Sequence, residues 1–406
     1  MNKTTGALVV GGNLNGLSIA RSLGRHGVPV WVVSPPNIRL ASFSRYTRRT
    51  LPWPPGDDET QVEYLLEIAA RNDLDQWVLF PTSDESAALL SRFHSKLSRR
   101  FRVSAPTWNV LRWAYDKRLT YRLAADQKVD YPATSYPLTD ADLEGVNCEF
   151  PAILKPAIHA SMNRLTTDKA WRVSNHEELM VRFREARELM PADLILVQEM
   201  IPGSGASQFS FAALCLEGKT IASLTARRTR QYPIDFGYSS SFVETMNVPE
   251  IVAPSQRLLA AIGYTGIVEV EYKFDSRDGK FKLLDINPRL WTWSPLCSRA
   301  GMDFPYLLWK MIQGIPVSEQ RAPAGVRWVR MSTDVPAAFQ EMLRGRLDLG
   351  EYLQSLRGPL QFALAAADDP LPALMDLPVF AFKHIYNAYA GLRKSAPAAR
   401  KCPAKT

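Results

Sequence analysis

Cysteine pairs are missing from this chain of 406 residues. The cysteines stand far apart with no CxxC spacing, and the five histidines also lack the spacing of metal ligands. The four cysteines are Cys148, Cys215, Cys297 and Cys402. We therefore expect neither a disulfide framework nor a zinc cluster.

A long apolar run is missing as well. No stretch approaches the ~18–20 uncharged apolar residues that a membrane span needs. The apolar run near the N-terminus ends at Gly11-Gly12 without a small-residue cleavage site, so it indicates a first strand rather than a signal peptide. We expect a cytoplasmic protein without a transmembrane segment.

Acidic residues are outnumbered by basic ones, 41 to 49, which gives a formal net charge of +8. This excess suits anionic small molecules, nucleic acid or an acidic membrane face equally well. Part of it is local, because five Lys and Arg residues crowd the last fourteen positions, where we favour a solvated tail. No nucleic-acid-binding motif accompanies the charge, so we expect no nucleic-acid partner.

The first hundred residues alternate between strand and helix patterns. A short apolar strand over 6–12 is followed by helical spacing from Leu17 to His26, a glycine stop at Gly27 and a second strand over 28–33. A further round follows, with a helix at about 59–71, a strand over 76–80 and a helix opened by residues 81–85. This order predicts a doubly wound parallel sheet.

An acidic residue is missing where a dinucleotide site would need one. Gly11 to Gly16 only approximates GxGxxG, and the second strand ends in Ser34-Pro35-Pro36, with no acid to hold a ribose. We therefore do not expect NAD or FAD. The glycine turn is expected to serve a substrate carboxylate or amine, or simply tight packing, since the helix N-terminus can hold an anion.

Strands dominate the middle of the chain. A helix is predicted over 116–130, and strands and helices then follow to about residue 286, with a loop after residue 229. These are strands over 151–156, 194–200, 208–216, 220–229, 267–275 and 280–286, and helices over 176–190 and 252–262. Beyond about residue 300 the chain is helical and broken by prolines.

One predicted hairpin, turning at Asp278-Gly279, carries clustered polar residues. Alternate residues of a strand share a face, so Glu271 on the outgoing strand and Asp285 and Asn287 on the returning strand converge. Three oxygen ligands of this kind suit Mg²⁺ or Mn²⁺ shared with substrate phosphates. A solvated face of alternating charge is the alternative. Asparagine is uncommon in strands, however, and Pro288 directly follows Asn287.

Basic residues interrupt two other strands. Lys155 lies in an otherwise apolar strand, and Arg228 and Arg230 occupy alternate positions of another. Such charges in a closed cleft are costly without partners, so we expect an anion between them. Arg289, just after the hairpin, has the planar fork that suits an anion in two-point contact.

Residues 285–289 resemble the E-x-N-P-R motif that closes the nucleotide site of ATP-grasp enzymes, with Asp285 in place of Glu. Weaker similarities occur in the family's order along about residues 1–320. They are Asp116-Lys117, the lysine strand 153–156, the hinge 197–203 and the basic strand 227–233. The chain is thus similar to ATP-grasp carboxylate–amine ligases, including those like D-aspartate ligase and carbamoyl phosphate synthetase.

The resemblance implies an α/β fold in three parts. A pre-ATP-grasp Rossmann-like domain covers 1–112. A two-lobed α+β ATP-grasp domain covers 113–318, with lobes of about 113–200 and 201–318. Residues 319–406 form a helical C-terminal extension with a basic tail. The loop 159–164 lacks the glycines of family loops that fold over the γ-phosphate.

The resemblance also implies roles for individual residues. The ATP-binding set is Lys117, Lys155, Gln198, Glu199, Met200, Ile201 and Gln208. The metal ligands are Glu271, Asp285 and Asn287, the catalytic residues Arg228, Arg230 and Arg289, and the substrate-binding residues Gly12, Asn13, Asn15 and Asp84.

The implied function is ATP-dependent ligation of a carboxylate to an amine through an acyl phosphate, with ATP and Mg²⁺ or Mn²⁺ as cofactors. The partners would be ATP and small-molecule carboxylate and amine substrates. A homodimer is a possible assembly. The alternatives are an ATP-grasp kinase, which keeps the phosphoryl group on its substrate, and an ATP-binding protein without turnover.

Overall fold

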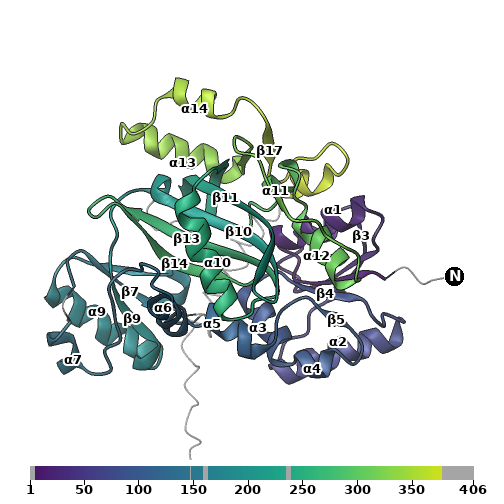
Figure 1. Cartoon of the computed structure of the whole chain (residues 1–406), viewed down its shortest axis with the longest axis horizontal. Coiled ribbons are helices and arrows are strands. Elements are labelled where there is room, and N and C mark those ends of the chain that lie inside the picture. Colours follow the sequence, from purple (N-terminus) through teal and green to yellow (C-terminus); the bar gives the residue numbers. More distant parts are fainter. Residues whose placement is uncertain (1–4, 147, 159–162, 235–238, 377–406) are drawn as a thin grey trace, which may run out of the picture.

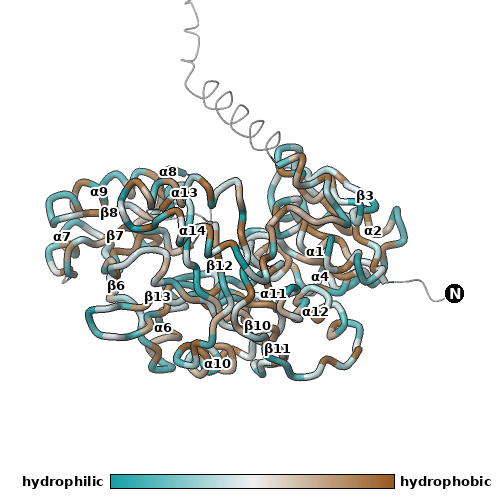
Figure 2. The backbone as a smooth tube through the Cα atoms, turned by 90° about the horizontal axis from the view of Figure 1, so that it is seen from above, coloured by the Kyte–Doolittle hydropathy of each residue, from teal (hydrophilic) through white to brown (hydrophobic). Residues whose placement is uncertain are grey.

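The computed structural model describes residues 5–146, 148–158, 163–234 and 239–376 (Figure 1). Most of the loop 159–164 and the basic tail lie outside these residues. Figures 1 and 2 both show the N-terminal domain and a small lobe at opposite ends of the molecule, with the largest sheet between them. No helix in the described part of the chain is both long and apolar enough to cross a membrane.

The N-terminal domain is a parallel sheet of five strands in the order β3-β2-β1-β4-β5. Its main elements are β1 (Ala7–Val10), α1 (Leu14–Arg25), β2 (Val30–Ser34), β3 (Thr47–Pro52), α2 (Asp58–Arg71), β4 (Val78–Pro81), α3 (Asp84–Arg92) and β5 (Arg102–Val103). The predicted doubly wound sheet is confirmed. Gly27 follows α1 at φ +77°, a conformation that favours glycine and explains the stop.

The small lobe is a four-stranded sheet in the order β6-β9-β7-β8, with short helices and α9 packed around it. Two helices lead into it, α5 (Trp108–Tyr115) and α6 (Lys117–Asp126). Its elements are β6 (Thr134–Ser135), α7 (Asp140–Glu144), β7 (Ala152–Pro156), α8 (Arg164–Asp168), β8 (Trp171–Val173), α9 (His176–Leu189) and β9 (Ile195–Glu199). The strands predicted over 151–156 and 194–200 are therefore confirmed.

The largest sheet has eight strands in the order β14-β13-β10-β11-β12-β16-β17, with β15 beside β11. Its main strands are β10 (Gln208–Leu216), β11 (Lys219–Tyr232), β12 (Ser239–Met246), β13 (Gly266–Asp275) and β14 (Lys280–Asn287), accompanied by α10 (Val252–Ala261), α11 (Pro295–Arg299) and α12 (Phe304–Ile312). β13 and β14 pair antiparallel, so the predicted hairpin is confirmed.

Strand β12 occupies part of the region after residue 229 that we expected to be a loop. Its serines gave the segment the composition of a loop, yet Ser240, Ser241, Phe242 and Val243 are all buried. Because consecutive residues point to opposite faces, both faces of this strand are covered. The alternation that identifies a half-buried strand is therefore absent from its sequence.

The region after residue 318 is helical as expected, with α13 (Met331–Leu343) and α14 (Leu349–Ser355). It also supplies three short strands, β15 (Gln320–Arg321), β16 (Arg327–Val329) and β17 (Leu360–Phe362). β16 pairs with β12 and β17 pairs with β16. The extension thus completes the largest sheet.

Candidate active site

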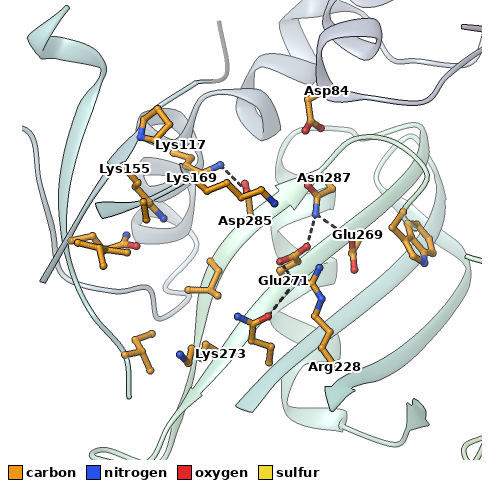
Figure 3. Close-up of a pocket in the computed structure, with 18 of the residues that line it drawn as sticks. Asp84, Lys117, Lys155, Lys169, Arg228, Glu269, Glu271, Lys273, Asp285 and Asn287 are labelled. Atoms are coloured by element: carbon orange, nitrogen blue, oxygen red, sulfur yellow. Dashed lines mark hydrogen bonds and ion pairs between the residues drawn. The ribbon is translucent and has the colours of Figure 1, made fainter. Parts of the chain in front are cut away.

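A cavity of about 500 Å³ lies between the small lobe and the β13–β14 hairpin (Figure 3). β7 and β9 form one wall, the hairpin forms the other, and the start of α3 reaches its edge. Its charged lining residues include Asp84, Lys117, Lys155, Lys169, Arg228, Glu269, Glu271, Lys273, Asp285 and Arg289. This density of charge in a cleft is typical of a site for a charged ligand.

The hairpin brings the predicted metal ligands together. Glu271 pairs across the strands with Asp285, and Glu269 pairs with Asn287. The Asn287 amide donates to Glu271 Oε1 at 2.8 Å and to Glu269 Oε2 at 3.1 Å. The convergence of Glu271, Asp285 and Asn287 on one volume, predicted from strand alternation, is confirmed.

Two cations neutralise these carboxylates (Figure 3). Lys117 Nζ lies 2.7 Å from Asp285 Oδ2, and Arg228 Nη1 lies 2.8 Å from Glu271 Oε2. Burial alone would lower the pKa of Lys117, but the neighbouring Asp285 carboxylate raises it above its ordinary value. Each carboxylate therefore has a cationic partner within the protein.

This donor set fits a magnesium ion. The described residues hold no group of three His, Cys, Asp or Glu side chains that could bind a metal unaided. Two carboxylates and an amide are a smaller set, and Mg²⁺ commonly uses one or two carboxylates together with phosphate oxygens and water. A metal at this position would thus depend on a bound phosphate.

Lys155 has a different environment from the other cations. It is 8% exposed, and its Nζ donates to the Tyr121 hydroxyl at 2.8 Å, which in turn donates to the Leu284 carbonyl. No described carboxylate forms an ion pair with it. Burial, with the nearby Lys117 charge, lowers the pKa of Lys155 to about 7. An anion in the cavity would restore its charge.

The low pKa of Lys155 makes stability depend on pH. The unfolded amine has the ordinary pKa of 10.5, so between about pH 7 and 10.5 the unfolded state binds more protons than the folded state. Stability should therefore rise with pH in this window, by up to about 1.4 kcal/mol per pH unit from this group. Lys155→Met removes the titration. In urea denaturation, the free energy of unfolding of the wild type should rise relative to that of Lys155→Met between pH 7 and pH 9. A difference between the two proteins that does not change with pH would contradict this.

The predicted adenine hinge, Gln198 to Ile201, lines the cavity from the end of β9. Burial would raise the pKa of Glu199, but hydrogen bonds from the Ala133 amide and from the Lys282 and Arg277 side chains lower it. These donors engage both oxygens of the carboxylate. The Glu199 side chain is therefore engaged within the protein. The Glu199 and Met200 amides also donate, to the Ala133 and Pro151 carbonyls, so the Ile201 amide is the hinge N–H left to contact a base among the described residues.

A comparison of families and relatives agrees with this geometry. A family model described as the carbamoyl-phosphate synthase L chain, ATP binding domain, matches residues 237–320, which include the hairpin. D-aspartate ligase of Enterococcus faecium (strain Aus0004) is 25% identical over 259 residues, which cover 58% of this chain and 59% of that protein. The match therefore spans less than two thirds of this relative.

Two solved structures share the arrangement of domains. The L-amino acid ligase from Bacillus licheniformis has a TM-score of 0.61 at 14% identity, covering 77% of this chain and 75% of that chain. The biotin carboxylase domain dimer of the Hydrogenobacter thermophilus 2-oxoglutarate carboxylase, in complex with MgADP and bicarbonate, has a TM-score of 0.63 at 14% identity, covering 80% and 74%. The chain has the ATP-grasp fold.

One residue predicted for the nucleotide site, Arg230, does not line the cavity between the small lobe and the β13–β14 hairpin (the ATP-grasp cavity). Arg230 donates two hydrogen bonds, of 2.9 and 2.8 Å, to Asp334 of α13, and the two side chains are 7% and 0% exposed. The register of β11 against β12 shifts on both sides of Arg230, so two-residue spacing no longer places it beside Arg228. The expectation that both arginines face the triphosphate is therefore wrong for Arg230.

Arg230→Ala should therefore cost stability rather than nucleotide affinity. It would leave the Asp334 carboxylate buried with the Ser241 hydroxyl as its remaining side-chain donor among the described residues. Breaking a buried ion pair costs about 3–5 kcal/mol of the free energy of unfolding. Urea denaturation measures this, with the exposed Arg99→Ala as control. If Arg230→Ala had normal stability but no longer bound ATP, the result would instead support a phosphate-binding role for Arg230.

The predicted substrate residues of the N-terminal domain separate into two groups. A Cβ at Gly12 would meet the Ile38 carbonyl at 2.3 Å, and Asn15 donates to the Thr82 and Leu290 carbonyls, so both serve packing. Asn13 caps α1 by accepting from the Gly16 amide. Asp84 does reach the ATP-grasp cavity.

Asp84 orients Arg289 at the edge of this cavity. Arg289 donates to Asp84 Oδ1 and Oδ2 at 2.9 and 3.1 Å, and to Asn287 Oδ1 at 3.3 Å. Gln208, from the start of β10, accepts from Arg228 Nη1 at 3.2 Å. The fork of Arg289 is thus fixed between the N-terminal domain and the hairpin.

Four charged lining residues were not predicted as site residues, Glu85, Lys169, Glu269 and Lys273. Lys273 shares the strand face of Glu271, so alternation could have found it, and its Nζ donates to the Gly203 carbonyl at 3.0 Å. Glu269 accepts from Ser210 and Trp293, and burial together with Glu271 raises its pKa. Lys169 follows α8 at φ +64°, and nothing in its sequence context indicates a site.

Proposed function

We propose that this chain is an ATP-dependent carboxylate–amine ligase. The observation that carries the proposal is the composition of one cavity. Lys155, which has no carboxylate partner among the described residues, lines it together with Glu271, Asp285 and Asn287 of the hairpin. Lys155 can take an anion as its partner, and the two carboxylates, which pair with Lys117 and Arg228, are ligands that a metal ion accompanying that anion could use. A metal–nucleotide complex satisfies both.

The reaction would proceed in two displacements. A substrate carboxylate oxygen attacks the γ-phosphorus of ATP, so that an acyl phosphate forms and ADP leaves. The amine nitrogen then attacks the acyl carbon, the bond to the phosphate oxygen breaks, phosphate leaves with the electron pair, and the nitrogen loses a proton. Positioning and charge neutralisation contribute most of the catalysis in such steps.

The residues of the cavity have separate tasks in this proposal. Lys155 and Arg228 hold the phosphates. Arg289, whose Nε and Nη2 donate to Asp84, would offer its remaining N–H to the carboxylate or the acyl phosphate. Glu271, Asp285 and Asn287 would hold Mg²⁺, which supplies Lewis-acid charge neutralisation when bound. The hinge backbone at 199–201 would contact the base.

The test is a screen of carboxylate and amine pairs for release of ADP and free phosphate from MgATP. A ligase releases both and forms an amide that mass spectrometry detects. A kinase would release ADP and retain the phosphoryl group on its substrate, and a non-catalytic ATP-binding protein would release neither.

A further inference from the structure

A second cavity, of about 750 Å³, is lined mainly by the N-terminal domain, with Tyr115 and Ile158 completing its wall. It lies at the carboxyl ends of β1, β2 and β4. β2 lies on one side of β1 and β4 on the other, so the strand order reverses at this point. Open parallel sheets bind ligands at such a switch point. The volume suits a small organic ligand.

Aromatic side chains form much of its wall. Trp53 follows β3, and Trp108 and Tyr115 lie at the two ends of α5. The rings of Trp108 and Tyr115 meet edge to face, with 5.6 Å between centroids. Leu89 and Val33 add aliphatic surface. Such a wall favours a flat or aromatic ligand body.

The charge of the second cavity is negative overall. Asp58 and Arg92 form an ion pair, and the Arg92 guanidinium also lies 5.3 Å from the centroid of the Trp108 ring. Glu85 accepts no hydrogen bond and forms no ion pair within the described ranges. It is therefore the unpaired carboxylate of this lining, exposed in the first turn of α3 and available to a cationic ligand group.

Glu85 also connects the two cavities. It lines both of them, one residue after Asp84, which holds Arg289 in the ATP-grasp cavity. A cationic group bound at Glu85 would therefore lie beside both cavities. An amine substrate binds as its ammonium ion, which must lose a proton before the nitrogen can attack the acyl carbon.

We propose that the second cavity binds the amine substrate, and that this substrate is a primary amine with an aromatic body. The ammonium group lies against Glu85, and the body packs against Trp53, Trp108 and Tyr115. This inference rests on the proposed function for the role of the amine, but the binding itself requires neither ATP nor turnover.

Binding of phenylethylamine and ethylamine to the purified full chain, measured by calorimetry, tests the proposal. Phenylethylamine should bind at least about tenfold more tightly, because ethylamine cannot cover the aromatic wall. Glu85→Gln and Trp108→Leu should each weaken phenylethylamine binding about tenfold. Glu59→Gln, an exposed change on α2, is the matched control and should leave it unchanged.

The melting temperature of each variant without ligand checks folding. Trp108→Leu should keep the thermal shift that MgATP produces, because Trp108 lies outside the ATP-grasp cavity. Equal affinity for the two amines, or equal binding by folded Glu85→Gln and wild type, would overturn the inference even if phosphate release supports a ligase. If phenylethylamine binds specifically but no carboxylate and amine pair gives phosphate release, the binding site is supported and the proposed ligase function is rejected.

Discussion

Asp285→Ala should abolish ATP turnover while the protein stays folded. Asp285 and Glu271 are the carboxylates that face each other across the hairpin, and a metal at this position would lose one of its two charged ligands. We expect kcat to fall by about two to three orders of magnitude or more, as when a group stabilising developing charge is removed. Release of ADP from MgATP with an active substrate pair measures the effect.

Several controls separate a metal ligand from a structural residue. Lys117 loses its ion-pair partner in Asp285→Ala, so Asp285→Asn, which keeps the shape, should lose turnover with less change in melting temperature. Asp285→Glu should retain turnover, because glutamate is the residue of the family motif. Asp75→Ala removes an exposed carboxylate from the N-terminal domain and should have no effect. Wild-type turnover in excess chelator would contradict a divalent metal at this site.

Lys155→Ala should weaken ATP binding by about one to two orders of magnitude, in line with ~1.5–3 kcal/mol for a charge-assisted hydrogen bond. Its ammonium group is buried against Tyr121 and has no carboxylate partner among the described residues, so a bound phosphate would provide its counter-charge. Without ligand, the melting temperature should hold or rise, because a poorly solvated charge is gone. Calorimetry with ATP and thermal melting measure the two effects.

Lys219→Ala is the matched control, because Lys219 is exposed at the start of β11 and pairs only with Glu319 in this part of the chain. It should leave ATP affinity unchanged. The MgATP-induced rise in melting temperature should shrink in Lys155→Ala and not in Lys219→Ala. A Lys155→Ala protein that unfolds, yet binds ATP normally once stabilised, would make Lys155 a structural residue and move the triphosphate elsewhere.

The hairpin could be predicted from the sequence because two local rules decide it. Period-two alternation fixes which side chains share a face, and Asp278-Gly279 fixes the turn, so the pairing of Glu271 with Asp285 follows. Lys155 was visible for a similar reason, since a charge inside an apolar strand stands out.

Features that depend on tertiary contacts could not be predicted. The register shifts around Arg230 arise from the partner strand, and the carboxylate that binds Arg230 lies 104 residues further along the chain. The wall of the second cavity joins Trp53 with Trp108, which are brought together by the sheet order rather than by spacing. Buried serines in β12 resemble a loop in composition, because burial by other elements leaves no pattern in sequence.

The strands contributed by the extension bear on where this fold can be divided. The family match ends at residue 320, but β16 and β17 continue the largest sheet beyond it. A protein shortened to that boundary would present β12 as an open edge and would deprive Arg230 of Asp334, its ion-pair partner. An alignment boundary drawn on nucleotide-site residues therefore differs from a boundary of folding, and shortened versions of this protein should retain residues through β17.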